Sequence, residues 1–508
     1  MTTTAPPSTV LMAHQAALVE KTRARSRFGV GWKPGTGKTI ALLSIFLDRP
    51  MPTVVLAPRS ILYAAWAADA RKVGVRDLFV YHRDPASRRK DREKLVGLIN
   101  AGKTPTIVTT YETFKNDMAI LREIGFLRLV IDESSKLKNP TSAISIVAGA
   151  FADAMSEVYI LSGTMAPNGP HEYWSQLRTI HPSLGRPPYI AAGRPNFWQW
   201  ANYWLVPLKK KIPVKVRDRV SGAESRATKE VIAGWYVNPT KKAAFEKMLA
   251  ENIWFLNTED CIDLPEARDI PVVVELGSAE NRAFDAAIDE LRVLTPDGES
   301  LAISVEARVQ KLRQITAGFV YFPDGPATVH RDIGTTKLDA VCEIIDSIGP
   351  DEPVVVWGEF RREIDRLAEG IASKCEGRTV EKIYGGTQDI GGIIDRFQRG
   401  EINTLVCHPA SVGHGATLTA ARYAIFASLG WSWELHEQAR ARIHRTGQRR
   451  SVFYYYLLAS GTTDKSMLIS LRKKENQAAA INRAVRALAA NRHASDEDEE
   501  QDGSHGTE

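Results

Sequence analysis

A glycine-rich hexapeptide near the N-terminus has the composition of a phosphate-binding loop. The run Pro34-Gly-Thr-Gly-Lys38-Thr39 precedes a helix-forming segment that begins at Ile40. Glycines let backbone N–H groups surround phosphate oxygens, and the N-terminus of the next helix adds positive potential. We expect the lysine to reach the terminal phosphates of ATP and the last threonine to bind Mg²⁺. The expected nucleotide contacts are Gly35, Thr36, Gly37, Lys38 and Thr39.

Two adjacent carboxylates follow a short apolar run, in the order Leu129-Val-Ile-Asp132-Glu133. Asp132 is expected to hold Mg²⁺, and Glu133 to orient and deprotonate the attacking water. An acid pair at the end of a strand can also serve only as the cap of the next helix. Combined with the glycine-rich loop, however, the pair predicts an ATP hydrolase that uses Mg²⁺.

A third element lies near the C-terminus and reads Gln438-Ala-Arg-Ala-Arg442-Ile-His444-Arg445-Thr-Gly447-Gln448. Arg442 and Arg445 are three residues apart and are neighbours if the segment is helical. Guanidinium groups that reach the γ-phosphate stabilise transition-state charge, an effect of about 10³ to 10⁵ in rate. The other interpretation is a solvated basic helix face. We expect a nucleotide site built from both halves of the chain, with catalytic residues Lys38, Glu133, Gln438, Arg442 and Arg445.

Three more polar residues fit the same site. Gln15 lies upstream of the glycine-rich loop, and its amide has the donor and acceptor needed to read adenine. Ser162 and Thr164 follow another apolar run and can bond to the carboxylate loop, so that they relay its state towards the second half of the chain. A surface glutamine and a plain turn are the respective alternatives.

Short apolar runs must position these residues. In the first part of the chain the runs are Thr53–Pro58, Thr106–Thr110, Leu127–Asp132 and Val158–Gly163, and a second series runs from Pro353 to Leu457. The runs do not alternate between apolar and polar residues, and helix-length segments separate them, as in parallel sheets covered on both faces. Ligands of such sheets bind at the carboxyl ends of the strands, where the residues above lie.

These series predict an α/β protein with two lobes. The expected first lobe is 1–180 and binds ATP, and the second is 335–462. Residues 181–334 are expected to form a mainly helical insertion and linker. Residues 463–494 have apolar positions near helical spacing and predict a helix that braces the fold or binds a protein partner. The acidic end, 495–508, is expected to be disordered.

Composition limits the class of protein. The chain has 508 residues, of which 44% are apolar and 25% charged, enough for two or three domains. It has neither an apolar run long enough for a membrane helix nor a signal peptide, so we expect a cytoplasmic protein without a membrane partner. The four cysteines lie far apart without a CxxC pair and support neither a disulfide framework nor a zinc site.

The charge distribution favours nucleic acid as a partner. Seven acids and no Lys or Arg lie in 495–508, which leaves 66 basic against 53 acidic residues in 1–494. The tail is either a solubilising end or a competitor of nucleic acid for the basic body, and it is also a candidate site for a protein partner. An aromatic run, Phe197–Trp204, precedes Lys209, Lys210 and Lys211. The lysines are candidate phosphate contacts, whereas the aromatics are either base-stacking residues or core.

Taken in order, these motifs resemble the Swi/Snf-like branch of helicase-related ATPases, within the DEAD/DEAH-type helicase superfamily. The matching elements are His14-Gln15, Gly35–Thr39, Leu56-Ala-Pro58 with Trp66, Asp132-Glu133, Ser162–Thr164 with Pro167-Asn168, Gly413-His-Gly415, Trp431 and Gln438–Gln448. The resemblance implies two RecA-like lobes, ATP in the cleft between them and duplex DNA tracked across both. It also implies that Gly413 and Gly415 belong to the nucleotide site, and that Arg59 and Tyr111 lie beside the tracked strand.

The chain departs from the family pattern at several positions. Trp32-Lys33 replaces an acid and a glutamate before the loop, Ser134-Ser135 follows the carboxylates, and Trp431-Ser-Trp433 replaces Trp-Asn-Pro. The chain resembles the compact versions in phages and bacteria, and this resemblance implies a cytoplasmic location in a bacterium or a phage-infected host cell. The expected function is a DNA-dependent ATPase that translocates on duplex DNA. The alternatives are a strand-separating DNA helicase in replication, repair or recombination, and a DNA-binding scaffold clamped by nucleotide.

Overall fold

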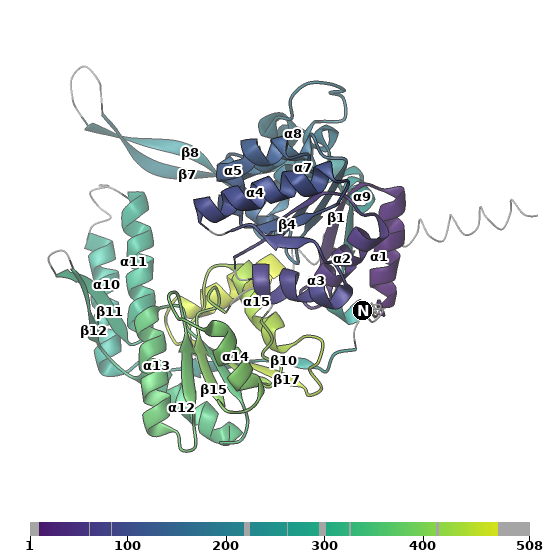
Figure 1. Ribbon diagram of the computed structural model, residues 1–508. Coiled ribbons are helices and arrows are strands. Elements are labelled where there is room, and N and C mark those ends of the chain that lie inside the picture. The colour runs from purple at the N-terminus through teal and green to yellow at the C-terminus, as the bar shows by residue number, and fades with distance from the viewer. Residues whose placement is uncertain are drawn as a thin grey trace, which may run out of the picture. The chain divides into compact units, whose positions relative to one another are not determined.

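The computed structural model describes residues 10–59, 61–82, 84–217, 224–261, 263–293, 301–324, 327–412 and 416–475 (Figure 1). The chain divides into two compact units. The described part of the first runs to Leu208 and includes Gly234–Asp263, and the second comprises Lys209–Ala233 and Leu264–Lys473. Each unit is built around its own sheet.

The first unit contains a parallel sheet of seven strands in the order β3-β4-β2-β5-β6-β1-β9. Its strands are β1 (Arg27–Trp32), β2 (Thr53–Leu56), β3 (Leu78–Val80), β4 (Thr106–Thr109), β5 (Arg128–Asp132), β6 (Glu157–Leu161) and β9 (Ile253–Leu256). Its helices are α1 (Ala13–Ala24), α2 (Lys38–Asp48), α3 (Ala68–Val73), α4 (Pro85–Asn100), α5 (Tyr111–Glu123), α6 (Ala143–Ala152), α7 (Tyr173–Ile180), α8 (Phe197–Trp204) and α9 (Lys242–Asn252), and a π-helical turn (Leu62–Ala67) precedes α3.

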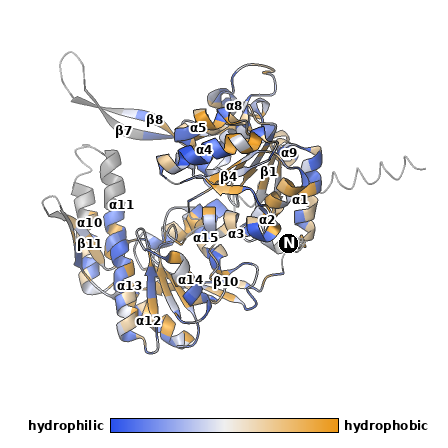
Figure 2. Cartoon of the chain, viewed as in Figure 1, coloured by the Kyte–Doolittle hydropathy of each residue, from blue (hydrophilic) through white to orange (hydrophobic). Residues whose placement is uncertain are grey.

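Alternate residues of each central strand enter two different cores. In β5, Leu129 and Ile131 pack in one cluster with residues of α5, α6 and α7, whereas Val130 packs in the other with residues of α1, α2 and α3. Figure 2 shows the resulting hydrophobic colour along the strands. Burial on both faces explains why the strands have no apolar–polar alternation.

Two glycines of β1 allow β9 to lie beside it. A Cβ at Gly29 would come within 2.8 Å of Ile253 Cγ1, and one at Gly31 within 2.5 Å of Phe255 Cδ1. Both distances are shorter than a carbon–carbon contact permits. The glycine-rich approach to the phosphate-binding loop therefore also has a packing function.

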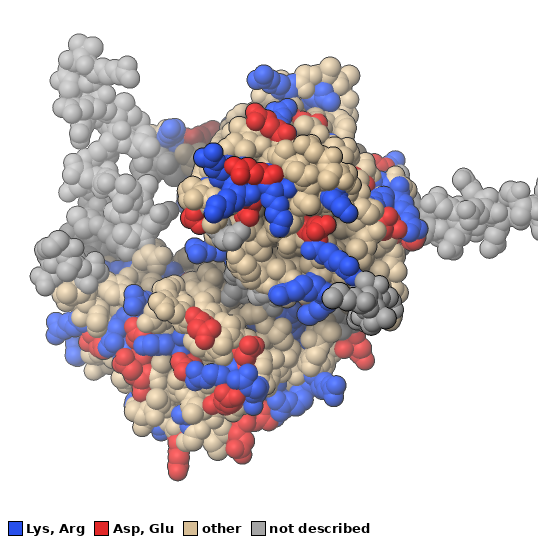
Figure 3. Space-filling model, viewed as in Figure 1, with Lys and Arg blue, Asp and Glu red and all other residues tan. Residues whose placement is uncertain are grey.

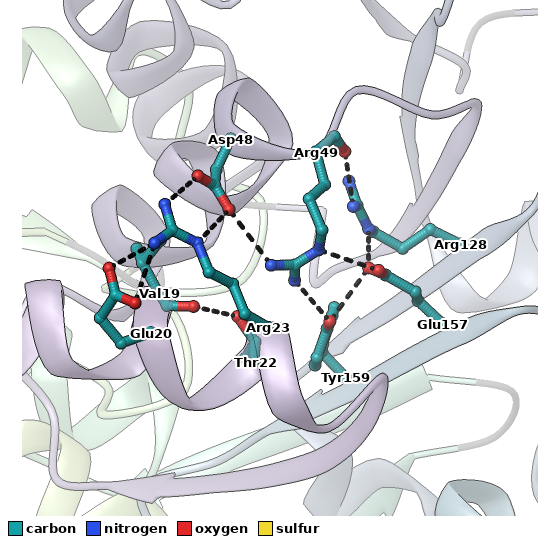
Figure 4. Close-up of polar contacts among 9 residues, drawn as sticks. All are labelled: Val19, Glu20, Thr22, Arg23, Asp48, Arg49, Arg128, Glu157 and Tyr159. Atoms are coloured by element: carbon teal, nitrogen blue, oxygen red, sulfur yellow. Dashed lines mark hydrogen bonds and ion pairs between the residues drawn. The ribbon is translucent and has the colours of Figure 1, made fainter.

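A polar network at the amino ends of β5 and β6 stabilises the first unit (Figure 4). The fully buried Arg128 donates through Nε to Glu157 Oε2 at 2.7 Å, and Arg49 donates through Nε to Glu157 Oε1 at 3.1 Å. Tyr159 donates its hydroxyl to the same carboxylate at 3.0 Å. A buried carboxylate is tolerated here because cations and a hydroxyl surround it.

The second unit contains a parallel sheet of six strands in the order β10-β17-β16-β13-β15-β14. Its strands are β10 (Ala267–Val274), β13 (Val354–Trp357), β14 (Val380–Ile383), β15 (Thr404–Cys407), β16 (Tyr423–Phe426) and β17 (Val452–Ala459). Its helices are α10 (Ser278–Val293), α11 (Leu301–Thr316), α12 (Thr336–Ile348), α13 (Arg361–Lys374), α14 (Ile390–Gln398) and α15 (Trp433–Ile443). The predicted fold class, two α/β lobes with parallel sheets, is confirmed.

The segment 181–334 differs in detail from a mainly helical insertion. It contributes β9 to the first sheet and β10 to the second, and thus supplies one edge strand to each. It also forms two antiparallel hairpins, β7 (Leu205–Arg217) with β8 (Glu224–Val237) and β11 (Phe319–Asp324) with β12 (Ala327–Asp332). The predicted boundaries 181 and 334 therefore do not coincide with the limits of the two units.

The C-terminal prediction is covered only in part. Residues 464–475 are helical, and Met467, Leu468 and Leu471 pack into the core of the second unit. The rest of the expected helix and the acidic tail lie outside the described residues. Within the described ranges, no helix is long and apolar enough to cross a membrane.

Candidate nucleotide site

The phosphate-binding loop joins β1 to α2. Gly35 and Gly37 have φ values of +88° and +76°, and Gly37 is the N-cap of α2, which begins at Lys38. Glycine adopts positive φ without the strain of other residues. The Lys38 ammonium donates to the carbonyl of Trp32 at 2.7 Å and to that of Lys33 at 3.1 Å. The sequence-predicted loop thus has the expected strand–turn–helix setting, with Thr36 buried and Thr39 in the first turn of the helix.

The residues preceding the loop in sequence bind its backbone. Gln15 is buried, and its amide donates to the Gly37 carbonyl at 3.2 Å while accepting from the backbone N–H of Met12 at 2.9 Å. The His14 ring makes a hydrogen bond with the Thr36 carbonyl at 2.9 Å. The alternative of a surface glutamine is wrong. The amide holds the loop, whereas its proposed reading of adenine stays a prediction.

Asp132 ends β5 and is almost fully buried. The indole N–H of Trp66 donates to its Oδ2 at 2.9 Å. Burial raises the pKa of the Asp132 carboxyl above its ordinary value, and the Trp66 hydrogen bond and the positive charge of Lys38 oppose that shift. Strands β5 and β1 lie on either side of β6 in this parallel sheet, so Asp132 and the loop that follows β1 lie at the same carboxyl edge.

Glu133, the residue after β5, has a left-handed backbone with φ of +64°. Its Oε1 accepts hydrogen bonds from the hydroxyls of Ser162 at 3.1 Å and Ser135 at 3.2 Å. The Thr164 N–H donates to Ser162 Oγ at 3.1 Å. The predicted contact between the carboxylate loop and Ser162–Thr164 is present, while the relay assigned to it stays a prediction.

The structure adds Gln176, which sequence reasoning missed, and a role for Trp66, which the sequence analysis named without one. Gln176 of α7 accepts from the Ser134 hydroxyl at 2.7 Å and donates to the Met165 carbonyl at 2.6 Å, so it ties the carboxylate loop to the segment after β6. Trp66 was recognised only as a family match, without its role as a donor to Asp132. No local pattern marks Gln176 in the mixed polar and apolar sequence of α7, because its burial and its partners depend on tertiary packing.

The arginine element belongs to the second unit. Helix α15 ends at Ile443, so Arg442 lies in its last turn and Arg445 lies beyond it. The condition under which the two arginines would be helical neighbours is therefore not met at Arg445, and their role at the γ-phosphate stays a prediction. Arg442 and Gln438 are buried, and Arg445 donates to the Ala416 carbonyl at 3.0 Å.

The rest of this element has a clear structural purpose. The Gln448 amide donates to the carbonyls of Ala421 at 2.8 Å and Thr419 at 3.2 Å, which fixes the turn that follows the helix. Gly413 and Gly415, the other nucleotide residues predicted in this half, lie outside the described residues.

The candidate nucleic-acid residues have different surroundings. Arg59 is exposed after β2. Tyr111 donates its hydroxyl to the carbonyls of Asp132 and of Glu133, so this hydroxyl supports the carboxylate loop.

The lysine run and the aromatic run differ in burial. Lys209, Lys210 and Lys211 are exposed on β7, and Lys209 pairs with Glu230 at 3.2 Å. Trp200 and Trp204 are buried, which supports the core alternative for them, whereas Trp198 is 56% exposed.

The donors of the first unit fit a hydrated Mg²⁺ better than a closed metal cage. Among the described residues there is no group of three or more His, Cys, Asp or Glu side chains that could hold a metal ion. Mg²⁺ usually keeps several waters and is bound through one or two carboxylates together with substrate phosphates. The buried carboxylate of Asp132, close enough to feel the charge of the loop lysine, matches that requirement.

Two family models match the chain. The SNF2-related domain matches residues 17–203, and the helicase conserved C-terminal domain matches residues 336–447. Together they cover more than half of the chain, and each lies within one unit.

Curated relatives share low sequence identity over most of the chain. CHR12 of Arabidopsis thaliana, named "Probable ATP-dependent DNA helicase CHR12", is 22% identical over 82% of this chain, which spans 36% of CHR12. Chromodomain-helicase-DNA-binding protein 7 of Homo sapiens is 24% identical over 82% of this chain and 14% of its own length. Protein p41 of Acyrthosiphon pisum secondary endosymbiont phage 1 is 22% identical, with 82% of this chain and 85% of p41 covered.

A solved structure was also matched. It is the SWI2/SNF2 ATPase core of Sulfolobus solfataricus in complex with double-stranded DNA, which is 19% identical, with 96% of this chain and 97% of that chain covered and a TM-score of 0.40.

Proposed function

Because the chain belongs to the SNF2-related family of helicase-like ATPases, we propose that it hydrolyses ATP to ADP and phosphate and uses that reaction to translocate on duplex DNA. The observation that supports the proposal is that the loop lysine, Asp132 and the Glu133–Ser162 contact follow the neighbouring strands β1, β5 and β6 at one edge of the first sheet. These are the groups that phosphoryl transfer to water requires.

Residues of the first unit have separate roles in the proposed reaction. The backbone N–H groups of Gly35–Lys38 bind phosphate oxygens. The Lys38 ammonium exchanges its hydrogen bonds with the Trp32 and Lys33 carbonyls for contacts with the terminal phosphates. Thr39 and Asp132 hold Mg²⁺, which neutralises charge on the phosphates when bound. Glu133, oriented by the hydroxyls of Ser162 and Ser135, positions the attacking water and accepts its proton.

The second unit is proposed to complete the site. Arg442 and Arg445 would reach the γ-phosphate when nucleotide draws the two units together, and would stabilise the charge of the transition state. Gln438 lies four residues before Arg442 on α15 and is proposed to act beside it. Cycles of closure and opening would then step the units along one strand.

DNA is the proposed partner on two grounds. The names of the relatives in Arabidopsis and Homo sapiens refer to DNA helicase or to helicase and DNA binding. The body of the chain is basic, with 66 Lys and Arg in total and only 53 acids before residue 495. Counterion release from phosphates favours binding to such a surface.

Phosphate release tests this function in one series. The rate is measured without DNA and with single-stranded, duplex and forked DNA. We expect duplex DNA to stimulate turnover most. A protein without turnover under all conditions would be the nucleotide-clamped scaffold.

Translocation is separated from unwinding by two displacement assays. A translocase releases the third strand of a triplex without opening the duplex, whereas a strand-separating helicase also unwinds the duplex. Triplex release without unwinding is the expected result. Unwinding would favour a helicase in replication, repair or recombination.

A further inference from the structure

The edge strand β9 brings a distant part of the chain to the phosphate-binding loop. It comes from the segment 181–334 and pairs in parallel with β1, on the side away from β6. Trp32 lies opposite Leu256, the last residue of β9. Because parallel strands end at the same edge of a sheet, the residues after Leu256 emerge beside the loop. The proposed ATP chemistry uses none of them.

Two hydrogen bonds join this segment to the first residues of the loop. The Lys33 N–H donates to the Leu256 carbonyl at 2.9 Å. The Thr258 hydroxyl donates to the Pro34 carbonyl at 3.3 Å, across 224 residues of sequence. Thr258 is only 7% exposed, and a buried polar group that loses its partner costs the structure free energy.

A short 3₁₀ turn, Thr258–Asp260, holds this hydroxyl in place. The Asp260 carboxylate accepts from the Asn257 N–H at 2.9 Å, and the Cys261 N–H donates to the Thr258 carbonyl at 3.2 Å. Both ends of the turn are therefore bonded, which limits the positions that the hydroxyl can take.

Pro34 is also contacted from the side of β6. A Cβ at Gly163 would lie 2.8 Å from Pro34 Cδ, closer than carbon atoms of two residues approach. Gly163 follows Ser162, whose hydroxyl donates to Glu133. Pro34 thus lies between the segment that follows β6 and the segment that follows β9.

The residues held in this way are the ones that receive the loop lysine. The Lys38 ammonium donates to the carbonyls of Trp32 and Lys33, and the Thr36 hydroxyl donates to the Lys33 carbonyl at 2.9 Å. A different path of the chain at Lys33 and Pro34 would displace these acceptors. The contact from β9 consequently bears on the geometry of the whole loop.

We propose that Thr258 is a positioning residue of the nucleotide site, whose hydroxyl holds the phosphate-binding loop in the conformation that receives the phosphates. The inference rests on the proposed function, because it takes this loop as the place where nucleotide binds. Without the hydroxyl, the free loop spends part of its time in other conformations, and the apparent affinity falls with the competent fraction. The bound phosphates restore the loop, so the loss falls on binding and not on the chemical step.

The test compares Thr258→Val with Thr258→Ser. Valine keeps the branched shape of threonine without the hydroxyl, whereas serine keeps the hydroxyl. Calorimetry with ADP and Mg²⁺ should show binding about 3- to 10-fold weaker in the valine variant, the effect of one hydrogen bond. The KM for ATP should rise by a similar factor while kcat stays within about twofold. The serine variant should bind ADP like the wild type.

Thr53→Val is the matched control. Thr53 is fully buried, and its hydroxyl donates to the Met51 carbonyl at 2.8 Å. It begins β2 and thus lies at the amino edge of the same sheet, opposite the loop. This variant also loses a buried hydroxyl but should bind ADP like the wild type. Thermal unfolding of each protein separates a loss of stability from a loss of affinity.

Nucleotide held by exposed cations must be distinguished from nucleotide in the loop. Lys and Arg side chains gather over α4 (Figure 3), and such a surface attracts phosphates. Calorimetry is therefore done at physiological ionic strength, which screens exposed charges. Lys38→Ala gives the ADP binding that remains without the loop lysine.

A Thr258→Val protein with wild-type ADP affinity would overturn the proposal, as would a Thr258→Ser protein as weak as the valine variant. If the valine variant does not fold, Thr258→Ala, which also lacks the hydroxyl, is measured in its place.

The outcome is separable from the proposed function. If ADP affinity depends on the Thr258 hydroxyl but ATP is not hydrolysed and DNA is not translocated, the positioning role stands and the motor function fails. If triplex strands are released while Thr258→Val matches the wild type in ADP affinity and in KM, the motor function stands and the positioning role fails. A wild-type protein that binds no ADP would overturn both.

Discussion

At the residue scale, the buried Asp132 carboxylate is costly to the fold and is expected to be essential to the reaction. Burial disfavours its charged form, and hydrogen bonds from the Trp66 indole and the Glu133 backbone together with the charge of Lys38 oppose this effect only in part. Such groups are common where charge is needed for chemistry. The cost to stability and the benefit to Mg²⁺ binding can be separated by substitution.

Asp132→Asn should abolish Mg²⁺-dependent turnover and stabilise the fold at pH 8. The raised pKa means that the folded protein binds the Asp132 proton more tightly than the unfolded chain, so the carboxylate destabilises the fold above that pKa and the cost disappears as the pH falls. Asparagine can still accept from Trp66. Urea unfolding at pH 8 and at pH 4, close to the ordinary carboxyl pKa of 3.8, should show the gain shrinking at the lower pH. An unchanged gain would contradict the assignment.

Glu133→Gln should lower the phosphate-release rate by about 10² to 10⁴, the usual contribution of a general base. The amide keeps an oxygen that can accept from Ser162 but cannot take a proton from water. Binding of ADP, measured by calorimetry, should remain within about twofold of wild type. Lys38→Ala serves as the companion variant and should lose both turnover and nucleotide affinity. Near-normal hydrolysis by either protein would refute the site assignment.

At the scale of elements, the phosphate-binding loop depends on the strand before it and on the helix before that. The side chains of β9 occupy the space that a Cβ at Gly29 or Gly31 would need. On the side of α1, the Gln15 amide donates to the Gly37 carbonyl. A Cβ at Gly37 would lie within 2.2 Å of that amide nitrogen. The loop is thus held by packing against β1 and by hydrogen bonds from α1.

Gly31→Ala should destabilise the first unit by about 1 to 3 kcal/mol, the usual cost of overpacking a core. The added methyl meets the Phe255 ring. A Gly31→Ala, Phe255→Leu double variant lacks the ring and should recover part of the lost free energy of unfolding. Gly97→Ala is the control, because a Cβ there meets nothing within 4 Å in the helix α4, and it should stabilise by about 0.5 to 1 kcal/mol. Urea unfolding measures both. Equal effects of the two alanines would exclude the packing explanation.

At the scale of the whole molecule, the proposed reaction needs groups from both units. Lys38, Asp132 and Glu133 belong to the first, whereas Arg442 and Arg445 belong to the second. Each unit has its own sheet and cores, so each can fold around its own part of the site. Under this proposal, the rate of ATP hydrolysis depends on the second unit supplying its arginines to the nucleotide bound by the first.

Arg445→Lys should lower the phosphate-release rate by about 10³ or more while leaving ADP affinity nearly unchanged. Lysine keeps the charge but not the planar, forked geometry that matches phosphate oxygens. Arg450→Lys, which alters an arginine paired with Glu352 at 3.0 Å, is the matched control in the same unit. If both variants hydrolyse ATP at the wild-type rate, the second unit does not supply this group.

The sequence by itself determined the two α/β series, the loop and the carboxylate pair. Their signals are local, because glycine spacing, an apolar run and adjacent acids all lie within a few residues. Only the tertiary structure decided the partners of these residues. Trp66 and Gln176 reach the carboxylate loop through packing, and β9 and β10 leave the intervening segment to join different sheets. Such contacts join residues far apart in the chain, where no short-range pattern records them.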